Sequence, residues 1–101
     1  MRLSDENLRG RTVIAADGQV IGQVSALFLD AASWRVESLL IKLHKDVADR
    51  VGASRSMLHA GTVEVPVQMI QSVGDAVVLN VPVDELRTVL PSPVTSEPAR
   101  G

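Results

Sequence analysis

The stretch of sequence that decides the fold covers residues 12–43 and reads TVIAADGQVIGQVSALFLDAASWRVESLLIKL. It contains three apolar runs, and two short breaks, Asp17-Gly18 and Ala31-Ala32-Ser33, separate them. Short aliphatic runs that are bounded by turn residues are typical of β-strands. The stretch therefore predicts three strands joined by two tight turns, which together form a small β-meander.

The first turn predicts how its two strands pair. If Asp17 and Gly18 form a two-residue type I′ turn, Val13 lies opposite Gly22 and the flanking apolar residues also face one another. Gly22 then marks a place where the sheet bends sharply. Regular alternation along the strands gathers one apolar set on a single face, which we expect to be the interior of the fold. This set comprises Val13, Ala15, Val20, Val24, Ala26 and Phe28.

The opposite face of the same strands becomes apolar toward the end of the meander. Leu39, Leu40 and Ile41 are consecutive, so this strand directs apolar side chains to both sides of the sheet. Such a strand is covered on both faces, either by the C-terminal helix and the long connection or by a second copy of the chain, and the sequence leaves both alternatives open. Under the second alternative the interface residues are Leu27, Leu29, Leu39, Ile41 and Leu43, with Trp34 beside the turn.

A capped helical turn and a short helix flank the meander. Ser4 precedes two acidic residues and predicts a capped turn near the N-terminus. After the meander, valines at helical spacing within a charged connection predict a short amphipathic helix over residues 46–51, which Gly52 ends. The rest of this connection, residues 53–61, is expected to be mobile because long connections in small domains are often functional or disordered.

The second half of the chain predicts two further strands and a helix. Alternating valines make residues 62–66 a strand, and residues 76–81 form another. Gly74 and Asp75 provide the turn before the second of these strands. Pro82 is a favourable first helical residue and predicts the start of a short C-terminal helix.

Length and composition describe one small domain. A chain of 101 residues builds a single core, which we assign to residues 1–90. Residues 91–101 are rich in Pro, Ser and Thr and predict a disordered tail. Hydrophobic residues make up 46% of the sequence, but only Phe28 and Trp34 are aromatic, so the core is expected to consist of Val, Leu, Ile and Ala.

Charge and hydropathy limit the classes of partner. The formal net charge is −2, which makes nucleic acid an unlikely partner because binding to a phosphate backbone requires a basic surface. An RNA site would have to rely on Arg9 and Arg11, with Trp34 as a stacking platform. No signal peptide is recognisable, and no apolar stretch approaches the roughly 18 residues that span a bilayer. The sequence therefore predicts a cytoplasmic protein without a membrane span.

No pattern in the sequence indicates catalysis or cofactor binding. The chain has no cysteine, and His44 and His59, its only histidines, lie in or beside the charged connection. Together with Asp46 and Asp49 they could surround a divalent ion, but their spacing matches no zinc or calcium motif. We expect no catalytic residues, no metal ligands and no cofactor, and hence no enzymatic activity.

Taken in order, the predicted strands resemble those of a PRC-barrel domain. This family includes the cytoplasmic part of the photosynthetic reaction-centre H subunit and the C-terminal domain of a ribosome maturation factor. The motifs that carry the resemblance are LRG at residues 8–10, DG at 17–18 followed by IGQV at 21–24, VESLLI at 36–41, VEVP at 63–66 and VGDAVV at 73–78.

The resemblance implies a mainly β fold, a small and mostly antiparallel barrel of about six strands with a short C-terminal helix. It also implies a binding role without catalysis and, among stand-alone members, frequent homodimers. We therefore expect a homodimeric adaptor that binds a further, unknown protein. Two alternatives are a small-ligand or metal-binding regulatory domain that uses the charged connection, and an RNA-processing or ribosome-associated factor.

Overall fold

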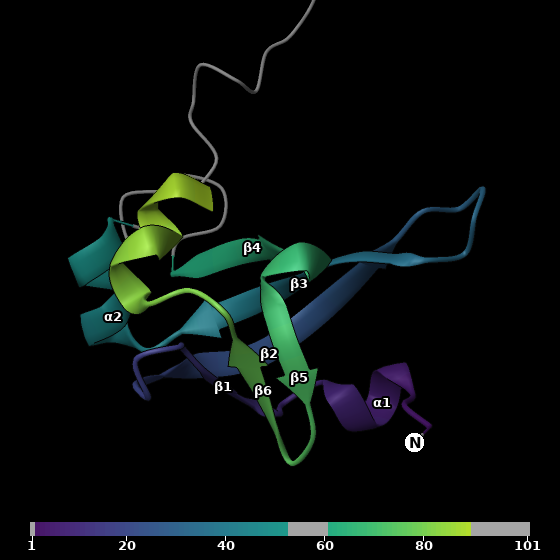
Figure 1. Cartoon of the computed structure of the whole chain (residues 1–101), viewed down its shortest axis with the longest axis horizontal. Helices are drawn as coiled ribbons and strands as arrows, with labels where there is room; N and C mark the ends of the chain where they lie inside the picture. The colour runs from purple at the N-terminus through teal and green to yellow at the C-terminus, as the bar shows by residue number, and fades with distance from the viewer. Residues whose placement is uncertain (1, 53–60, 90–101) are drawn as a thin grey trace, which may run out of the picture.

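The computed structural model describes residues 2–52 and 61–89 as a single six-stranded sheet with helices at its ends (Figure 1). The predicted disordered tail and most of the predicted mobile connection lie outside these residues. In chain order the elements are α1 (Asp5–Leu8), β1 (Thr12–Ile14), β2 (Val20–Leu29), β3 (Val36–Leu43), α2 (Lys45–Val51), β4 (Thr62–Pro66), the 3-10 helix η2 (Val67–Met69), β5 (Ile70–Val73), β6 (Ala76–Leu79) and the 3-10 helix η3 (Val83–Val89).

The strands follow the order β4-β3-β2-β1-β6-β5, and every neighbouring pair is antiparallel except β1 and β6, which are parallel. The prediction of a mainly β, mostly antiparallel fold is therefore confirmed. The sheet is not closed into a barrel, because β4 and β5 form its two edges. Pro66 has no N–H to donate at the end of β4, and the chain turns there directly into η2.

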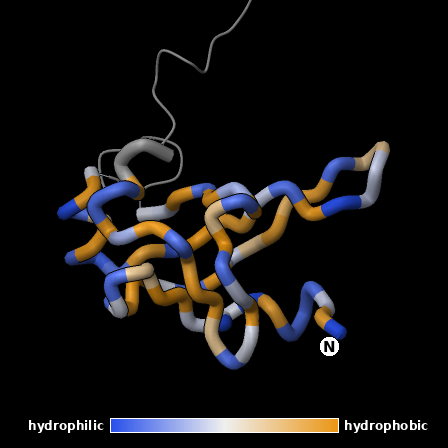
Figure 2. Tube along the Cα trace, in the orientation of Figure 1, coloured by the Kyte–Doolittle hydropathy of each residue, from blue (hydrophilic) through white to orange (hydrophobic). Residues whose placement is uncertain are grey.

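Apolar side chains from most elements meet in one core, and Figure 2 shows hydrophobic segments along the central strands. Two helices complete this core at one end of the sheet. α2 contributes Val47, Ala48 and Val51, while η3 contributes Val83 and Leu86, and all five are buried. Burial at these positions explains the apolar spacing that the charged connection shows in the sequence.

The first hairpin confirms the pairing of Val13 with Gly22, but its turn differs from the prediction. The N–H of Ala15 donates to the Gln19 carbonyl at 2.9 Å, and Gly18 alone in this loop has a positive φ, of 86°. A type I′ turn requires positive φ at both central residues, so this is a longer loop that ends in a left-handed glycine. The register shift that follows leaves Val20 exposed, contrary to the prediction.

A second irregularity reverses the predicted faces of β2. Val24 pairs with Ile41 and Ala26 with Leu40, so Ser25 is an extra residue opposite β3. Such a bulge changes which face every later side chain occupies. Leu27 consequently lies on the core side, together with its partner Leu39. The prediction that Phe28 is interior is wrong, because this residue lies on the outer face with 41% of its surface exposed.

The flanking elements largely match their predictions. The Ser4 hydroxyl accepts a hydrogen bond from the N–H of Asn7 at 3.1 Å and caps α1. The predicted helix after the meander is α2, and Gly52 ends it in the left-handed conformation. Gly74 and Asp75 connect β5 to β6 as predicted.

The C-terminal part departs from prediction in two respects. β6 ends at Leu79 rather than at Val81, because the Val81 carbonyl accepts a hydrogen bond from the N–H of Ala16 instead of continuing the β5 ladder. The predicted helix is the 3-10 helix η3, and an α-helix is not confirmed there.

Candidate functional site

The predicted interface residues fall into two groups in the structure. Leu39, Ile41 and Leu43 are at most 6% exposed, because the chain's own core covers them. Of the two alternatives for covering this face, the internal one therefore holds for these three residues, and they offer no surface to a partner. Leu27 is partly buried against the same core. Only Leu29 and Trp34 of the predicted set are well exposed, at 40% and 78%.

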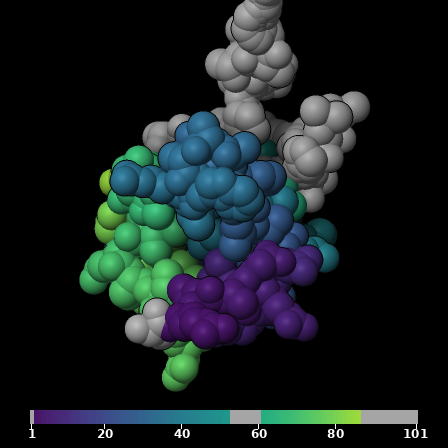
Figure 3. Space-filling view, turned by 90° about the vertical axis from the view of Figure 1, so that its right-hand side faces the viewer, coloured from purple at the N-terminus to yellow at the C-terminus, as the bar shows by residue number. Residues whose placement is uncertain are grey.

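Those two exposed residues lie on a projecting hairpin. The last pair between β3 and β4 is Ser38 with Pro66, whereas β2 and β3 continue as two strands on their own. We call this two-stranded segment, residues 28–37, the arm. It extends from the end of the sheet opposite α2 and η3, and Figure 3 shows its residues as a raised cluster on that end.

The tip of the arm is fixed by its own hydrogen bonds. The N–H of Asp30 donates to the Arg35 carbonyl at 2.8 Å, and the N–H of Trp34 donates to the Asp30 carbonyl at 2.7 Å. One carboxylate oxygen of Asp30 accepts from the N–H of Ala32 at 2.9 Å. This loop is longer than the predicted break at residues 31–33, and it holds Trp34 at a φ of 62°.

Exposed apolar side chains gather on and beside the arm. Sequence reasoning missed three of them, Phe28, Val36 and Val67, each about two-fifths exposed. Phe28 was missed because the bulge at Ser25 is not visible as a break in the apolar pattern. Val36 and Val67 lie within runs that predict ordinary strand and turn residues. Grouped apolar exposure of this kind marks interaction surfaces.

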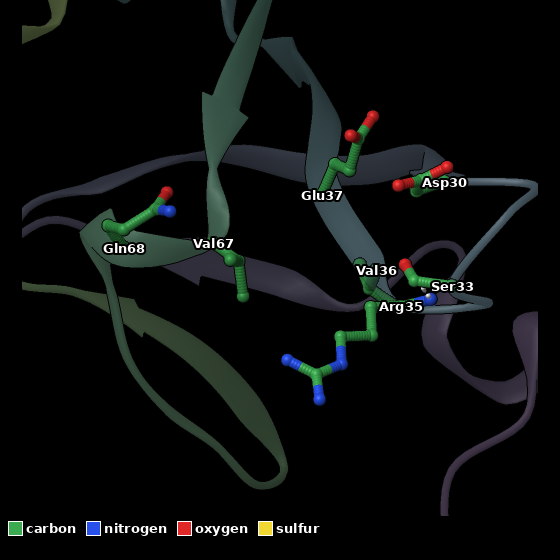
Figure 4. Close-up of a pocket in the computed structure, with 7 residues that line it drawn as sticks. All are labelled: Asp30, Ser33, Arg35, Val36, Glu37, Val67 and Gln68. Carbon is green, nitrogen blue, oxygen red and sulfur yellow. Dashed lines mark hydrogen bonds between the residues drawn. The ribbon is translucent and has the colours of Figure 1, made fainter.

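A groove of about 390 Å³ lies between the arm and η2 (Figure 4). Within residues 2–52 and 61–89, the side chains of Arg35 and Glu37 make no ion pair or hydrogen bond, so both charges are available to a partner. The arm provides five residues of the lining and η2 provides two. The lining residues are Asp30, Ser33, Arg35, Val36, Glu37, Val67 and Gln68.

Residues considered for other kinds of site have structural contacts. Arg11 donates from one guanidinium nitrogen to the Gly74 carbonyl and from the other to the Asn7 carbonyl, at 3.1 Å, so it ties α1 to the β5–β6 turn. Arg9 forms an ion pair with Asp5 at 3.1 Å. The two arginines of the RNA alternative are thus engaged in contacts within the chain.

The metal alternative receives no support from the described part of the chain. His44 is exposed and precedes α2, and its side chain makes no capping hydrogen bond. Across residues 2–52 and 61–89, no three His, Asp or Glu side chains come close enough to hold one ion. His59 lies outside the described residues.

The predicted turn residues have distinct roles. Asp17 accepts hydrogen bonds from the N–H of Gln19 at 3.2 Å and from the N–H of Val83 at 3.4 Å, so it joins the first hairpin to η3. Gly22 lies in close contact with the backbone of β3. Gly74 donates its N–H to the Ala76 carbonyl at 2.9 Å and closes the β5–β6 turn.

Comparison with known families identifies the family to which the chain belongs. The sequence model of the PRC-barrel domain matches residues 2–86, and the chain belongs to this family. The match covers α1 and all six strands. Comparison with curated proteins gave no match. Among the described residues, no helix combines the length and the apolar character that crossing a membrane requires.

Proposed function

We propose that this domain is a non-catalytic interaction and assembly module that acts as a homodimer through its arm. The observation that carries the proposal is the concentration of exposed apolar side chains on one projecting hairpin. Membership of the PRC-barrel family agrees with a small interaction domain. A partner protein would bind to the dimer. The module would act in the cytoplasm, and fractionation of cells that express the full chain would test this location.

The position of the arm supports this role physically. The arm lies beyond the elements that bury the core, so covering its apolar residues would require no rearrangement of the fold. Full burial of a fully exposed apolar side chain contributes about 1.5–3 kcal/mol. Leu29 and Val36 are about two-fifths exposed, so each would contribute a fraction of this, and Trp34, at 78% exposure, would contribute the most.

Light scattering coupled to size exclusion of the full chain tests the proposal. At tens of micromolar we expect a dimer, and Leu29→Glu should convert it to a monomer because a carboxylate replaces an apolar contact. Val20→Glu is the matched control, since Val20 is similarly exposed at 44% but lies on the first hairpin. A wild-type monomer, or equal loss of dimer in both variants, would contradict the proposal.

A further inference from the structure

The arm leaves one edge of β3 without a neighbouring strand. Beyond the Ser38–Pro66 pair, Val36 pairs with Leu29 of β2, Glu37 is an extra residue at a register shift, and no strand of the described residues lies on the other side of either residue. The Arg35 carbonyl points toward β2, where it accepts a hydrogen bond from the N–H of Asp30. Successive residues of a strand direct their backbone groups to alternate sides, so the N–H and carbonyl of Val36 point toward the open edge. An open edge of this kind is a template for pairing with another strand.

The groove lies directly beside this open edge. Val36 lines it from the arm, and Val67 and Gln68 line it from η2. Figure 4 shows the Arg35 side chain extending away from the arm on the side where Val67 lies. A volume of about 390 Å³ is sufficient for one aromatic side chain.

Trp34 is a suitable occupant that the chain itself provides. Its side chain is 78% exposed, which makes it the most exposed large apolar residue among those described. It is also the one described residue other than glycine with a positive φ. A bulky residue in this conformation is strained, and such strain is concentrated at functional positions. Tryptophan is also the residue type most enriched among the energetic anchors of interfaces.

Two copies related by a twofold axis would bring opposite charges together beside the open edge. In an antiparallel pairing of two β3 edges centred on Val36, Arg35 lies opposite the partner's Glu37, and Glu37 lies opposite the partner's Arg35. Trp34 precedes β3 and its φ of 62° takes it out of the extended conformation, so it lies beyond this short ladder, next to the partner's Ser38–Pro66 pair, where β4 ends and the groove begins. Arg35 and Glu37 have opposite charges, so both contacts are attractive.

We infer that two copies pair arm to arm about a twofold axis at Val36, so that Trp34 of each copy fills the groove of the other. This inference rests on the proposed homodimer and specifies its geometry. The occupant of the groove is thus a second copy of this chain rather than a peptide of another protein, because the anchor, the groove and the paired charges all lie within one surface.

Intrinsic fluorescence tests where Trp34 lies. The chain has one Trp and no Tyr, so its emission reports on Trp34 alone. Raising the concentration of the full chain across the dimerisation range should shift the emission to shorter wavelength and reduce quenching by acrylamide. Val20→Ala, on the first hairpin, should behave like the wild type. Emission that stays that of an exposed indole while light scattering reports a dimer would overturn the inference.

Charge exchange tests the symmetry. Arg35→Glu and Glu37→Arg should each raise the dissociation constant of the dimer by about tenfold or more, because each brings like charges together twice. An equal mixture of the two variants should restore association. In a mixed pair one chain carries two acidic side chains at these positions and the other carries two basic ones, so both contacts are attractive again. Heterodimers in the mixture support the inference, whereas their absence overturns it.

The two proposals fail separately in these experiments. A wild-type chain that stays monomeric at tens of micromolar contradicts the homodimer and with it the arm pairing. A dimer in which the mixture of variants is not rescued contradicts only the arm pairing and leaves the homodimer in place.

Discussion

Gly22 shows how a single missing side chain determines the packing of the sheet. A Cβ atom at this position would lie 2.1 Å from the Lys42 carbonyl oxygen and 2.9 Å from the Leu43 Cα. Both atoms belong to the backbone of β3, which cannot move aside as a flexible side chain would. The close approach of β2 and β3 at this end of the hairpin therefore depends on glycine.

Gly22→Ala should lower the free energy of unfolding by about 3 kcal/mol, because overpacking against backbone forces the strands apart. Urea denaturation of the purified chain measures this change. Gly74→Ala is the matched control: Gly74 has a negative φ, and a Cβ atom added there would meet nothing within 4 Å, so its effect should stay within about 0.5 kcal/mol. Equal effects of the two variants would show that close approach is not the cause.

The backbone conformation of Trp34 predicts that stability and association respond differently to mutation. Trp34→Ala and Trp34→Gly both remove the indole, so both should weaken the dimer. Only glycine relieves the left-handed φ of 62°, and Trp34→Gly should therefore unfold with a free energy about 1 kcal/mol higher than Trp34→Ala. Denaturation of both variants at a concentration where neither associates makes this comparison, and equal stabilities would contradict it.

At the scale of elements, local patterns predicted what depends on local chemistry. The cap of α1, the end of α2 at Gly52 and the strand β4 follow from residues that lie next to one another. The bulge at Ser25 could not be predicted, because apolar residues occur on both sides of it and either alternation fits the sequence. The extra residue changes which face of the sheet the later residues of β2 occupy. For this reason the sequence assigned Phe28 to the core and Leu27 to the interface, whereas the structure has them on the opposite faces.

The arm itself was only partly predictable. The sequence placed Leu29 and Trp34 at a surface, and the structure exposes both. The groove depends on η2 lying beside β3, a contact between segments distant in sequence, so Val67 and Gln68 carried no recognisable signal.

The attachment of η3 gives a prediction for that element. Leu86 is fully buried in the core, and Leu86→Ala should cost about 3 kcal/mol of stability because it leaves a cavity. Asp84→Ala, two residues earlier, removes an ion pair to Arg50 of 3.4 Å between side chains that are 70% and 44% exposed, and should cost less than about 1 kcal/mol. Chemical denaturation compares the two, and a larger loss from Asp84→Ala would show that the polar contact holds η3.

At the scale of the whole molecule, the elements that complete the core lie at the opposite end from the arm, the proposed binding surface. Helices α2 and η3 complete the core at one end, and the arm projects from the other (Figure 1). Surface substitutions on the arm should therefore leave the fold intact. Such variants can test the proposed function without unfolding the domain.

The unfolding temperature should depend on protein concentration. If the folded chain dimerises, mass action stabilises it further as concentration rises, and the midpoint of thermal unfolding should increase. Trp34→Ala should unfold at the same temperature at every concentration. Differential scanning fluorimetry with an extrinsic dye over a hundredfold range of concentration measures both, and a wild-type midpoint that does not change would contradict association.

The parallel pair of β1 and β6 has a consequence for the order of folding. It joins Thr12 to Ala76, from opposite ends of the domain, whereas β2 and β3 are adjacent in the chain. Long loops close slowly, so the β2–β3 hairpin should form early and the parallel pair late. During synthesis, the segment that carries the arm would thus leave the ribosome and acquire its hairpin before the strand that secures β1 has been made.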